Sequence, residues 1–202
     1  MRIPTKEACY RFIREMAMPD HIICHSLQVC RVALMLVHEL NGQQKRLNQQ
    51  LVQAGALLHD ITKPRSITTG EKHTDSGHDL LVKLGYPEVG DIIRQHVKLD
   101  AYSKNDALAE ANIVNYADKR VLHDRIVDLN ERMKYILERY GTTVEYRSRL
   151  KWLWEVSIEQ EKKIFITLPF SPSRIQDHME HVDMQAELRK IKTMVASQNR
   201  HW

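Results

Sequence analysis

Cysteine is scarce in this 202-residue sequence, and the pattern of the three that occur excludes a complete disulfide framework. Cys9, Cys24 and Cys30 are odd in number, and no two of them form a Cys-x-x-Cys pair. Such usage is typical of proteins from a reducing compartment. We therefore expect a cytoplasmic protein.

Long hydrophobic runs are also missing. The N-terminal segment 1–7 has no apolar signal core, and the longest apolar run, around Val32 to Val37, is too short to span a bilayer. Hydrophobic residues still make up 43% of the chain, which is enough to bury one sizeable core. We expect one compact domain that does not associate with a membrane.

No clear run of alternating apolar and polar residues predicts a strand, whereas helical spacing of apolar residues dominates the chain. The sequence therefore predicts an all-α fold. The expected helices cover residues 5–17, a segment capped by Asp20 and ending at 42, then 47–58, 73–84, 87–97, 106–140 with a possible break, 143–163 and 174–197. Residues 64–70 are expected to form a loop because Pro64 ends the third helical pattern, and 165–172 a linker or short extended piece.

The formal net charge is +4, from 30 basic and 26 acidic residues that are interspersed along the chain. This pattern indicates a solvated mixed surface rather than a nucleic-acid footprint, and it is compatible with attraction of an anionic substrate. We therefore expect no specific binding of nucleic acid.

The most informative stretch is Leu57 to Pro64, where an apolar helical run ends in His59, Asp60 and then Lys63. An imidazole nitrogen and a carboxylate together bind divalent cations, and a carboxylate can also bridge to a second ion. The dipeptide alone is not specific, because a second pair follows at 123–124. There, salt bridging within an arginine-rich helix is a sufficient explanation.

Further ligand-type residues surround the first pair in the sequence. His25, His73, His78, His96 and Asp118 each lie near apolar residues at helical spacing, which predicts side chains that face inward. Buried imidazoles and carboxylates are costly without a partner. Their expected convergence from separate helices therefore favours a shared cation.

The order of these residues resembles the HD-domain superfamily of metal-dependent phosphohydrolases. The similar segments extend over about residues 20–125: His25-Ser26, Leu57 to Lys63, His73 with Gly77, Leu84 to Pro87, Ile93 to His96, and Ile113 to Lys119. The resemblance implies a compact multi-helix HD-domain bundle over residues 1–163. Residues 164–202 are expected to form a linker and a C-terminal helix that packs on the core or takes part in a homodimer.

The resemblance also implies two cation sites. His25, His59, Asp60 and Asp118 would hold the first cation, and His73 and His96 the second, with Asp60 as the bridge. One or two ions of Fe, Mn, Zn, Co or Ni suit such ligands. His73 is preferred over His78 because family segments commonly have glycine shortly after the histidine, which matches Gly77.

The implied reaction is hydrolysis of a phosphoester or phosphoanhydride by a metal-activated water. A nucleotide or another small phosphorylated compound is the expected substrate, with Asp60 and Lys63 as catalytic residues. Lys63, Arg65, Lys98 and Lys119 are the candidates for phosphate contact. Thr62 stands where the common His-Asp-Ile-Gly motif of the family has glycine. A non-catalytic protein of the same fold that binds metal or nucleotide is the alternative.

Overall fold

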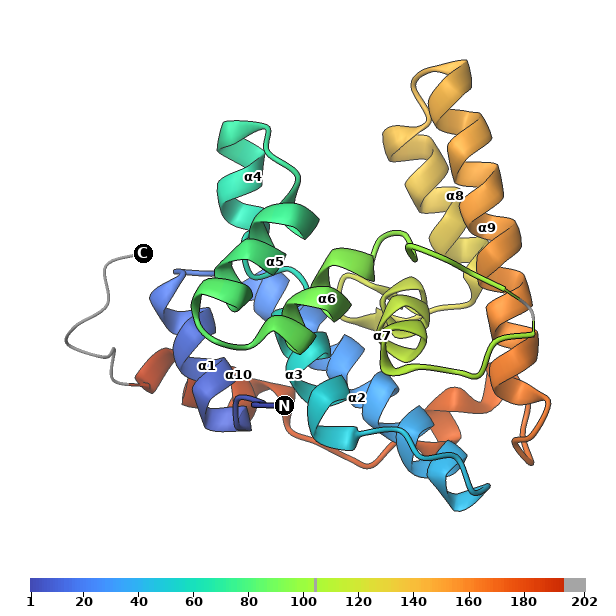
Figure 1. Ribbon diagram of the computed structural model, residues 1–202, viewed down its shortest axis with the longest axis horizontal. Helices are drawn as coiled ribbons and strands as arrows, with labels where there is room; N and C mark the ends of the chain where they lie inside the picture. The colour runs from blue at the N-terminus through green and yellow to red at the C-terminus, as the bar shows by residue number, and fades with distance from the viewer. Residues whose placement is uncertain (104, 195–202) are drawn as a thin grey trace.

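The computed structural model describes residues 1–103 and 105–194, and helices dominate this part of the chain. The prediction of an all-α fold is confirmed, with one very short hairpin added. The elements in Figure 1 are α1 (Lys6–Glu15), α2 (Asp20–Gly42), α3 (Gln49–Leu58), α4 (Lys63–Thr69), α5 (His73–Lys83), α6 (Pro87–Gln95), α7 (Glu110–Lys119), β1 (Val121–Leu122), β2 (Arg125–Ile126), α8 (Leu129–Tyr140), α9 (Val144–Phe165), the 3-10 helix η1 (Pro172–His178) and α10 (Met184–Thr193).

Helix α2 lies at the centre of the bundle. Its stripe of Val29, Val32, Leu36 and Leu40 is buried, as helical spacing predicts, and α2 packs against α3, α7 and α10. By length and composition α2 would also suit a membrane span, but 72% of its apolar window is buried inside the protein. Burial against neighbouring helices therefore accounts for its apolar composition.

Polar side chains fix where many of the helices begin. Thr5, Asn48, Asp128, Thr143 and Asp183 each accept a hydrogen bond from a first-turn backbone N–H of the helix that follows. Such caps satisfy donors that the helix itself leaves unpaired. The expected cap at residue 20 is wrong, since Pro19 precedes the helix and Asp20 is its first residue.

The loop expected at residues 64–70 is wrong, because Lys63–Thr69 form helix α4. Pro64 occupies the first turn, where a missing backbone N–H costs nothing and the fixed φ suits the helix. Gly70 ends α4 in the left-handed conformation, with φ of 74°. The proline that ends one helical pattern therefore also begins the next helix.

The segment expected as a helix with a possible break at 106–140 does break. Helix α7 is followed by antiparallel strands β1 and β2, in which Val121 pairs with Ile126, and then by α8. His123 occupies the hairpin turn with φ of 58°, so the His123-Asp124 pair does not lie in a helix as expected. The two-residue strands are too short to show alternation in the sequence.

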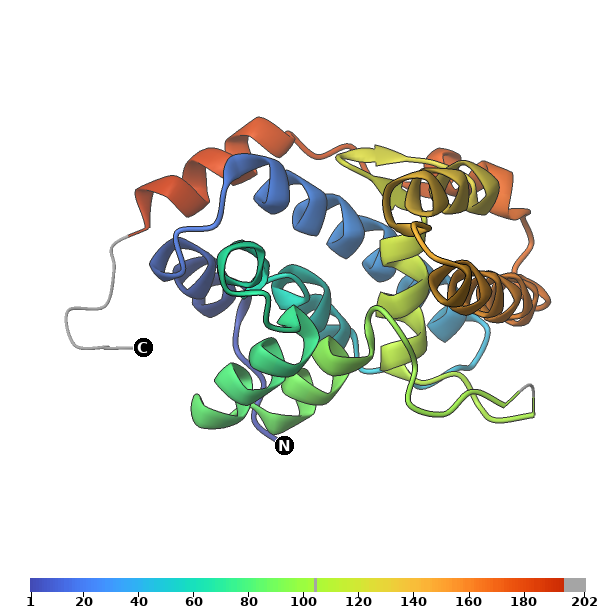
Figure 2. The same cartoon turned by 90° about the horizontal axis from the view of Figure 1, so that it is seen from above.

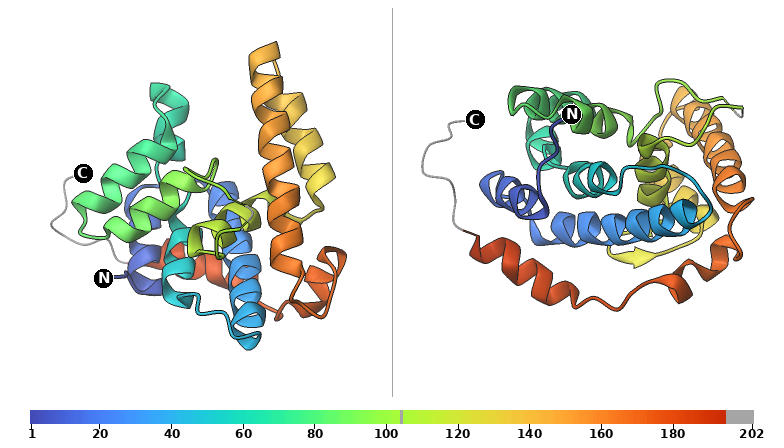
Figure 3. Two further views of the ribbon diagram at one scale, coloured as in Figure 1. Left: turned by 45° about the vertical axis from the view of Figure 1, so that its right-hand side comes forward. Right: turned by 60° about the horizontal axis from the view of Figure 1, so that its bottom comes forward.

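The C-terminal segment is not one continuous helix either. It consists of η1 and α10, separated by an irregular stretch, and the end expected at residue 197 lies outside the described residues. Figure 3 shows this segment running along α2 toward α1. Leu188 and Ile191 of α10 are buried in the common core, and the Glu187 carboxylate accepts the Tyr10 hydroxyl and pairs with Lys6 Nζ at 2.8 Å.

Two helical projections rise from one face of the bundle. One is α4, and the other is the antiparallel pair of α8 and α9, here called the arm; both are seen nearly end-on in Figure 2. Many of the exposed large apolar side chains lie on the arm: Leu137, Tyr140, Val144, Tyr146 and Trp152. Each projection contributes one cation to the polar cluster described next, Lys63 from α4 and Arg132 from α8.

Candidate metal centre

The six side chains expected to bind metal come together, although they belong to five separate parts of the fold. His25 lies in α2, His59 and Asp60 directly follow α3, His73 begins α5, His96 caps the end of α6, and Asp118 lies near the end of α7. Since α3, α6 and α7 all pack on one another, their ends meet at one place. The fold therefore collects the cluster around the point where several helices end.

Three of these side chains form a first group. His25 Nε2 lies 3.0 Å from Asp118 Oδ1, and His59 Nε2 lies 3.9 Å from the same oxygen. One potential ligand atom from each residue falls within 4.8 Å of the others. Nitrogen and oxygen ligands lie about 2.0–2.2 Å from zinc-like cations, so small shifts of the side chains would bring all three atoms around one ion.

Asp60 connects this group to a second one. Its Oδ2 is 3.4 Å from His59 Nε2, while its Oδ1 is 3.4 Å from His73 Nε2 and 3.5 Å from His96 Nε2. The nitrogens of His73 and His96 are 3.2 Å apart. One carboxylate thus presents an oxygen to each group, which is the arrangement that a bridging ligand requires.

Hydrogen bonds to main-chain carbonyls orient three of the imidazoles. The Nδ1 atoms of His25, His59 and His96 lie 2.8, 2.8 and 2.6 Å from the carbonyl oxygens of His123, Ala56 and Ile93. A carbonyl only accepts, so each Nδ1 donates its proton there and each Nε2 is the ring atom turned toward the cluster; in His25 this atom lies beside Asp118 Oδ1. The contribution of His123 was missed by sequence reasoning, because it acts through its backbone and its side chain gives no signal.

The fit of a metal to the cluster rests on two atoms without hydrogen-bond partners. Among the described residues, His59 Nε2 and Asp60 Oδ1 are buried and unpaired in this sense. Leaving such atoms unsatisfied is costly, and a cation would satisfy both at once. Mixed imidazole and carboxylate donors suit a divalent transition metal.

Two cations outside the cluster balance its carboxylates. Burial alone would raise the pKa of Asp60, but the charges of His59 and of Lys63, whose Nζ is 2.6 Å from Oδ2, hold it well below its ordinary value. The pKa of Asp118 is likewise held low against burial by its hydrogen bond with His25 and by Arg132, whose Nη2 lies 3.6 Å from Oδ1. Both carboxylates are therefore charged at neutral pH.

His73 and His78 have different surroundings. His73 faces Asp60 and His96, whereas His78 lies 2.9 Å from Asp79 and 3.6 Å from Asp91 of α6. Thr62, which stands where the family commonly has glycine, donates a hydrogen bond to the His73 carbonyl oxygen at 2.9 Å. The Thr62 hydroxyl thereby holds the start of α5, and with it His73, beside Asp60.

The four candidates for phosphate contact have different surroundings. Lys63 lies against Asp60, as described. Arg65 is exposed and pairs with Glu71 at 2.6 Å, and Lys98 is exposed with its Nζ 5.4 Å from the centre of the Trp152 ring. Lys119 is buried and donates to the carbonyl oxygens of His96 and Asn115, each at 3.1 Å, and burial lowers its pKa to about 8.

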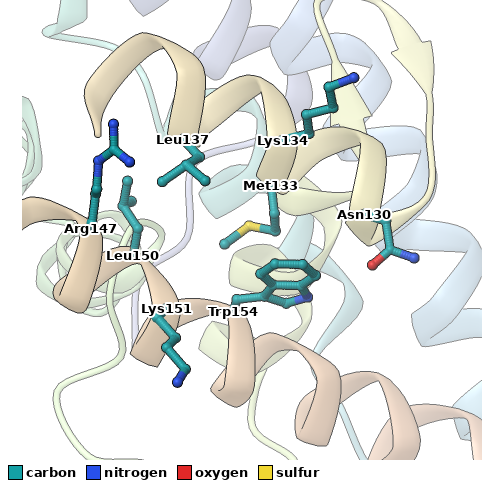
Figure 4. A pocket seen from close by; sticks show the side chains of 8 residues that line it. All are labelled: Asn130, Met133, Lys134, Leu137, Arg147, Leu150, Lys151 and Trp154. Atoms are coloured by element: carbon teal, nitrogen blue, oxygen red, sulfur yellow. The ribbon is translucent and has the colours of Figure 1, made fainter. Parts of the chain in front are cut away.

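A separate pocket lies within the arm (Figure 4). It has a volume of about 400 Å³ and apolar walls from Met133 and Leu137 of α8 and from Leu150 and Trp154 of α9. Basic side chains also line it, among them Lys134. None of the six cluster residues takes part, so this pocket is distinct from the candidate metal centre.

Comparison with known proteins places the cluster inside a recognised domain. Residues 22–121, about half of the chain, match the family model of the HD domain. An uncharacterised protein from Methanocaldococcus jannaschii is 25% identical over 135 residues, which is 60% of this chain and 79% of that protein. Its similarity therefore extends beyond a short motif.

Two longer proteins match over part of their length. Ribonuclease Y from Aquifex aeolicus is 36% identical over 78 residues, covering 38% of this chain and 13% of the enzyme. A tRNA (cytidine(56)-2'-O)-methyltransferase from Picrophilus torridus is 27% identical over 144 residues, covering 65% of this chain and 40% of that protein. The chain therefore spans only a minor part of both.

Among solved structures, a predicted HD superfamily hydrolase from an uncultured Thermotogales bacterium is similar at 23% sequence identity. The likeness covers 82% of this chain and 94% of that one, with a TM-score of 0.45.

Proposed function

Because the chain belongs to the HD-domain superfamily, we propose that it is a metal-dependent phosphohydrolase. The proposed reaction is hydrolysis of a phosphoester or phosphoanhydride bond in a nucleotide or another small phosphorylated substrate. The observation that carries the proposal is the meeting of ligand-type side chains around His59 Nε2 and Asp60 Oδ1, two buried atoms without hydrogen-bond partners; His73 joins them through Asp60 and His96.

The proposed ligand sets follow the two groups in the cluster. His25, His59, Asp60 and Asp118 would hold one divalent cation, and His73 and His96, sharing Asp60, a second. When bound, such cations lower the pKa of a water to about 7 and polarise a phosphoryl oxygen. Iron, manganese, zinc, cobalt and nickel all suit these donors.

The chain's own groups would orient the reactants. The carbonyl bonds to Nδ1 fix the ring orientation of His25, His59 and His96, so that Nε2 of each faces the place where a metal would bind. Lys63 would neutralise charge on the phosphoryl group, since its ammonium lies at the edge of the cluster and is partly exposed. Arg65 and Lys98, both exposed, are the further candidates for contact with distal phosphates, and Lys119 the buried one.

We further propose a cytoplasmic protein that acts on small molecules, without membrane association or specific binding of nucleic acid. A homodimer stays a prediction, and light scattering of the purified protein measures it directly.

The deciding experiment measures Mn²⁺-dependent product release from a panel of substrates. The panel contains nucleotides, dinucleoside polyphosphates, a generic phosphodiester and a short RNA, the last because one relative is named ribonuclease Y. We expect turnover of a small substrate by wild type and neither metal nor turnover in Asp60→Ala, because that carboxylate faces both groups.

His178→Ala is the matched control, since this histidine stacks on Phe170 and lies outside the cluster. It should keep both metal and turnover. Wild-type metal content in the Asp60→Ala variant would contradict the ligand assignment. Metal binding without turnover of any substrate would favour the non-catalytic alternative, and preferred cleavage of RNA would contradict the proposed substrate class.

A further inference from the structure

Outside the six cluster residues, Arg132 on α8 brings a partly paired charge to the centre, with its guanidinium also 5.9 Å from the centre of the Tyr135 ring. Its Nη2 lies 3.6 Å from Asp118 Oδ1, which is longer than a hydrogen bond, although only 13% of the side chain is exposed. Its Nε is buried without a hydrogen-bond partner. A guanidinium carries five donors in a planar fork, so Arg132 has donors left for a ligand.

Helix α8 approaches the centre near its start. It packs against α7, which carries Asp118, and there Arg132 lies opposite the Asp118 carboxylate. This helix lies beyond residues 22–121, so the match to the HD domain does not include it.

Arg132 has a counterpart in Lys63 of α4. Lys63 Nζ is 2.6 Å from Asp60 Oδ2, just as Arg132 approaches Asp118 Oδ1. His59 Nε2 is 3.4 Å from the first of these oxygens and 3.9 Å from the second. Each carboxylate next to His59 is therefore accompanied by one cation, and the two cations come from the two projections of the fold.

We propose that Arg132 and Lys63 form a phosphate-binding pair, which Asp118 and Asp60 hold in place until these carboxylates bind metal. The inference rests on the proposed function, since it places a phosphorylated substrate at this centre. Once Asp60 and Asp118 act as metal ligands, their attraction for the two side chains falls. The guanidinium fork and the ammonium then turn to phosphoryl oxygens, the fork making two parallel bonds and the ammonium acting as a point charge.

The proposal gives Arg132 two effects of opposite sign. In the metal-free protein its charge competes with a cation for Asp118, and in the loaded protein it stabilises bound phosphate. Removing the charge should therefore weaken phosphate binding without weakening metal binding. A merely structural role, in which Arg132 positions Asp118, would lower the affinity for both.

The test compares wild type with Arg132→Gln, Arg132→Lys and Lys134→Gln. Lys134 is the matched control, because it lies on the same helix but lines the pocket of the arm. Mn²⁺ is titrated into the metal-free proteins, and inorganic phosphate into the Mn²⁺-loaded ones by calorimetry. We expect Arg132→Gln to bind phosphate at least tenfold more weakly and Mn²⁺ at least as tightly as wild type. Arg132→Lys should fall between them for phosphate, and Lys134→Gln should match wild type in both titrations.

Three results would overturn the proposal. Two concern Arg132→Gln: an unchanged affinity for phosphate, or a loss of Mn²⁺ binding. The third is a Mn²⁺-loaded wild type that does not bind phosphate at millimolar concentration. Thermal unfolding shows whether each variant is folded, and if the glutamine variant is not, the lysine variant decides by the same criterion. Phosphate binding needs no turnover. If wild type hydrolyses no substrate but binds phosphate through Arg132, only the proposed activity is refuted. If wild type is active and Arg132→Gln binds phosphate as tightly as wild type, only the proposed phosphate-binding pair is refuted.

Discussion

His59 lies between the two carboxylates of the cluster, and its environment shows how the fold prepares a cationic site. Burial lowers its pKa, but Asp60 and Asp118 outweigh burial and raise it overall. The Nδ1 proton is committed to the Ala56 carbonyl oxygen, so any positive charge at Nε2 faces the carboxylates. The position next to Nε2 is therefore one where positive charge is stabilised.

The second group can be tested at His73. Its Nε2 is close to both Asp60 and His96, whereas the nearby His78 pairs with Asp79 and Asp91. We expect His73→Ala to lose one of two bound Mn²⁺ ions, or to bind them at least tenfold more weakly, because a direct ligand is removed. Elemental analysis after dialysis measures the content. Loss of metal in His78→Ala, with His73→Ala unchanged, would reverse the assignment.

Apolar helical spacing marked the cluster residues as candidates together with His78, and the resemblance to the HD domain singled out His73 through Gly77. Arg132 was not marked, because a charged residue on a polar helix gives the same pattern whether it faces solvent or a carboxylate. The hairpin of β1 and β2 turns the chain after α7, and α8 then packs on α7 with Arg132 next to Asp118. The carbonyl of His123 was invisible for a related reason, since every residue has one.

At the scale of elements, α5 and α6 pack closely because Gly77 has no side chain. A Cβ at this position would lie 2.8 Å from Ile93 Cγ2 and 3.4 Å from the Thr62 hydroxyl. Ile93 directly precedes the turn that carries His96, and Thr62 holds His73. A change at this glycine therefore reaches both histidines of the second group.

We expect Gly77→Ala to reduce the free energy of unfolding by about 1–3 kcal/mol through overpacking. It should also weaken the second metal site. Gly42→Ala is the control, because a Cβ there would meet nothing within 4 Å, and its stability should stay within about 1 kcal/mol of wild type. Urea unfolding with and without Mn²⁺ provides both values, and equal stability of the two variants would contradict the proposed contact.

One carboxylate adds polar contacts to the apolar packing of α10 on α1. The Glu187 carboxylate forms ion pairs with Lys6 and Lys190 and accepts a hydrogen bond from the Tyr10 hydroxyl. Burial opposes its charge, but these partners lower its pKa to about 2 from an ordinary value of 4.5. Because the folded pKa is depressed, the stabilisation is present above about pH 4.5 and is lost as the pH falls toward 2.

This loss amounts to about 2–3 kcal/mol, since one pKa unit corresponds to about 1.4 kcal/mol. Glu187→Gln should therefore unfold at lower denaturant concentration than wild type at pH 7, and the difference should shrink toward pH 3. Urea titrations at several pH values measure it. A difference that stays constant with pH would show that the charge of Glu187 is not responsible.

The apolar spacing in the sequence predicted most of the helices. It did not predict several of the residues at which they begin or end, because these depend on contacts with other elements. Pro64 is compatible with the end of one helix and the start of another, and only packing of α4 beside α5 distinguishes them. In the C-terminal segment, Asp183 begins α10 as a cap, whereas the sequence pattern continued without a visible break. Pro64 and Asp183 are both residues that commonly mark a helix end or start, but the sequence alone is compatible with more than one interpretation of each.

For the whole molecule, the core and the cluster are energetically separable. The helices pack around α2 through apolar contacts, and Lys63 and Arg132 balance the two carboxylates without a metal. We expect chelator-treated protein to keep its helical circular dichroism and a cooperative thermal transition. Mn²⁺ at one hundred times its dissociation constant should add about 2.7 kcal/mol, and Asp118→Ala should abolish most of that gain. Unfolding by chelator alone would show instead that the metal is needed for folding.

The balanced carboxylates also bear on the order in which the protein matures in a cell. If the chain folds before it binds a metal, the ion binds to a preformed site and not to an unfolded chain. Selection is then a competition among the ions at hand, governed by the affinity series of divalent metals and by their supply. The metal found in purified protein should therefore follow the growth medium, and changing the iron or manganese supply should change the occupant without changing the yield of folded protein.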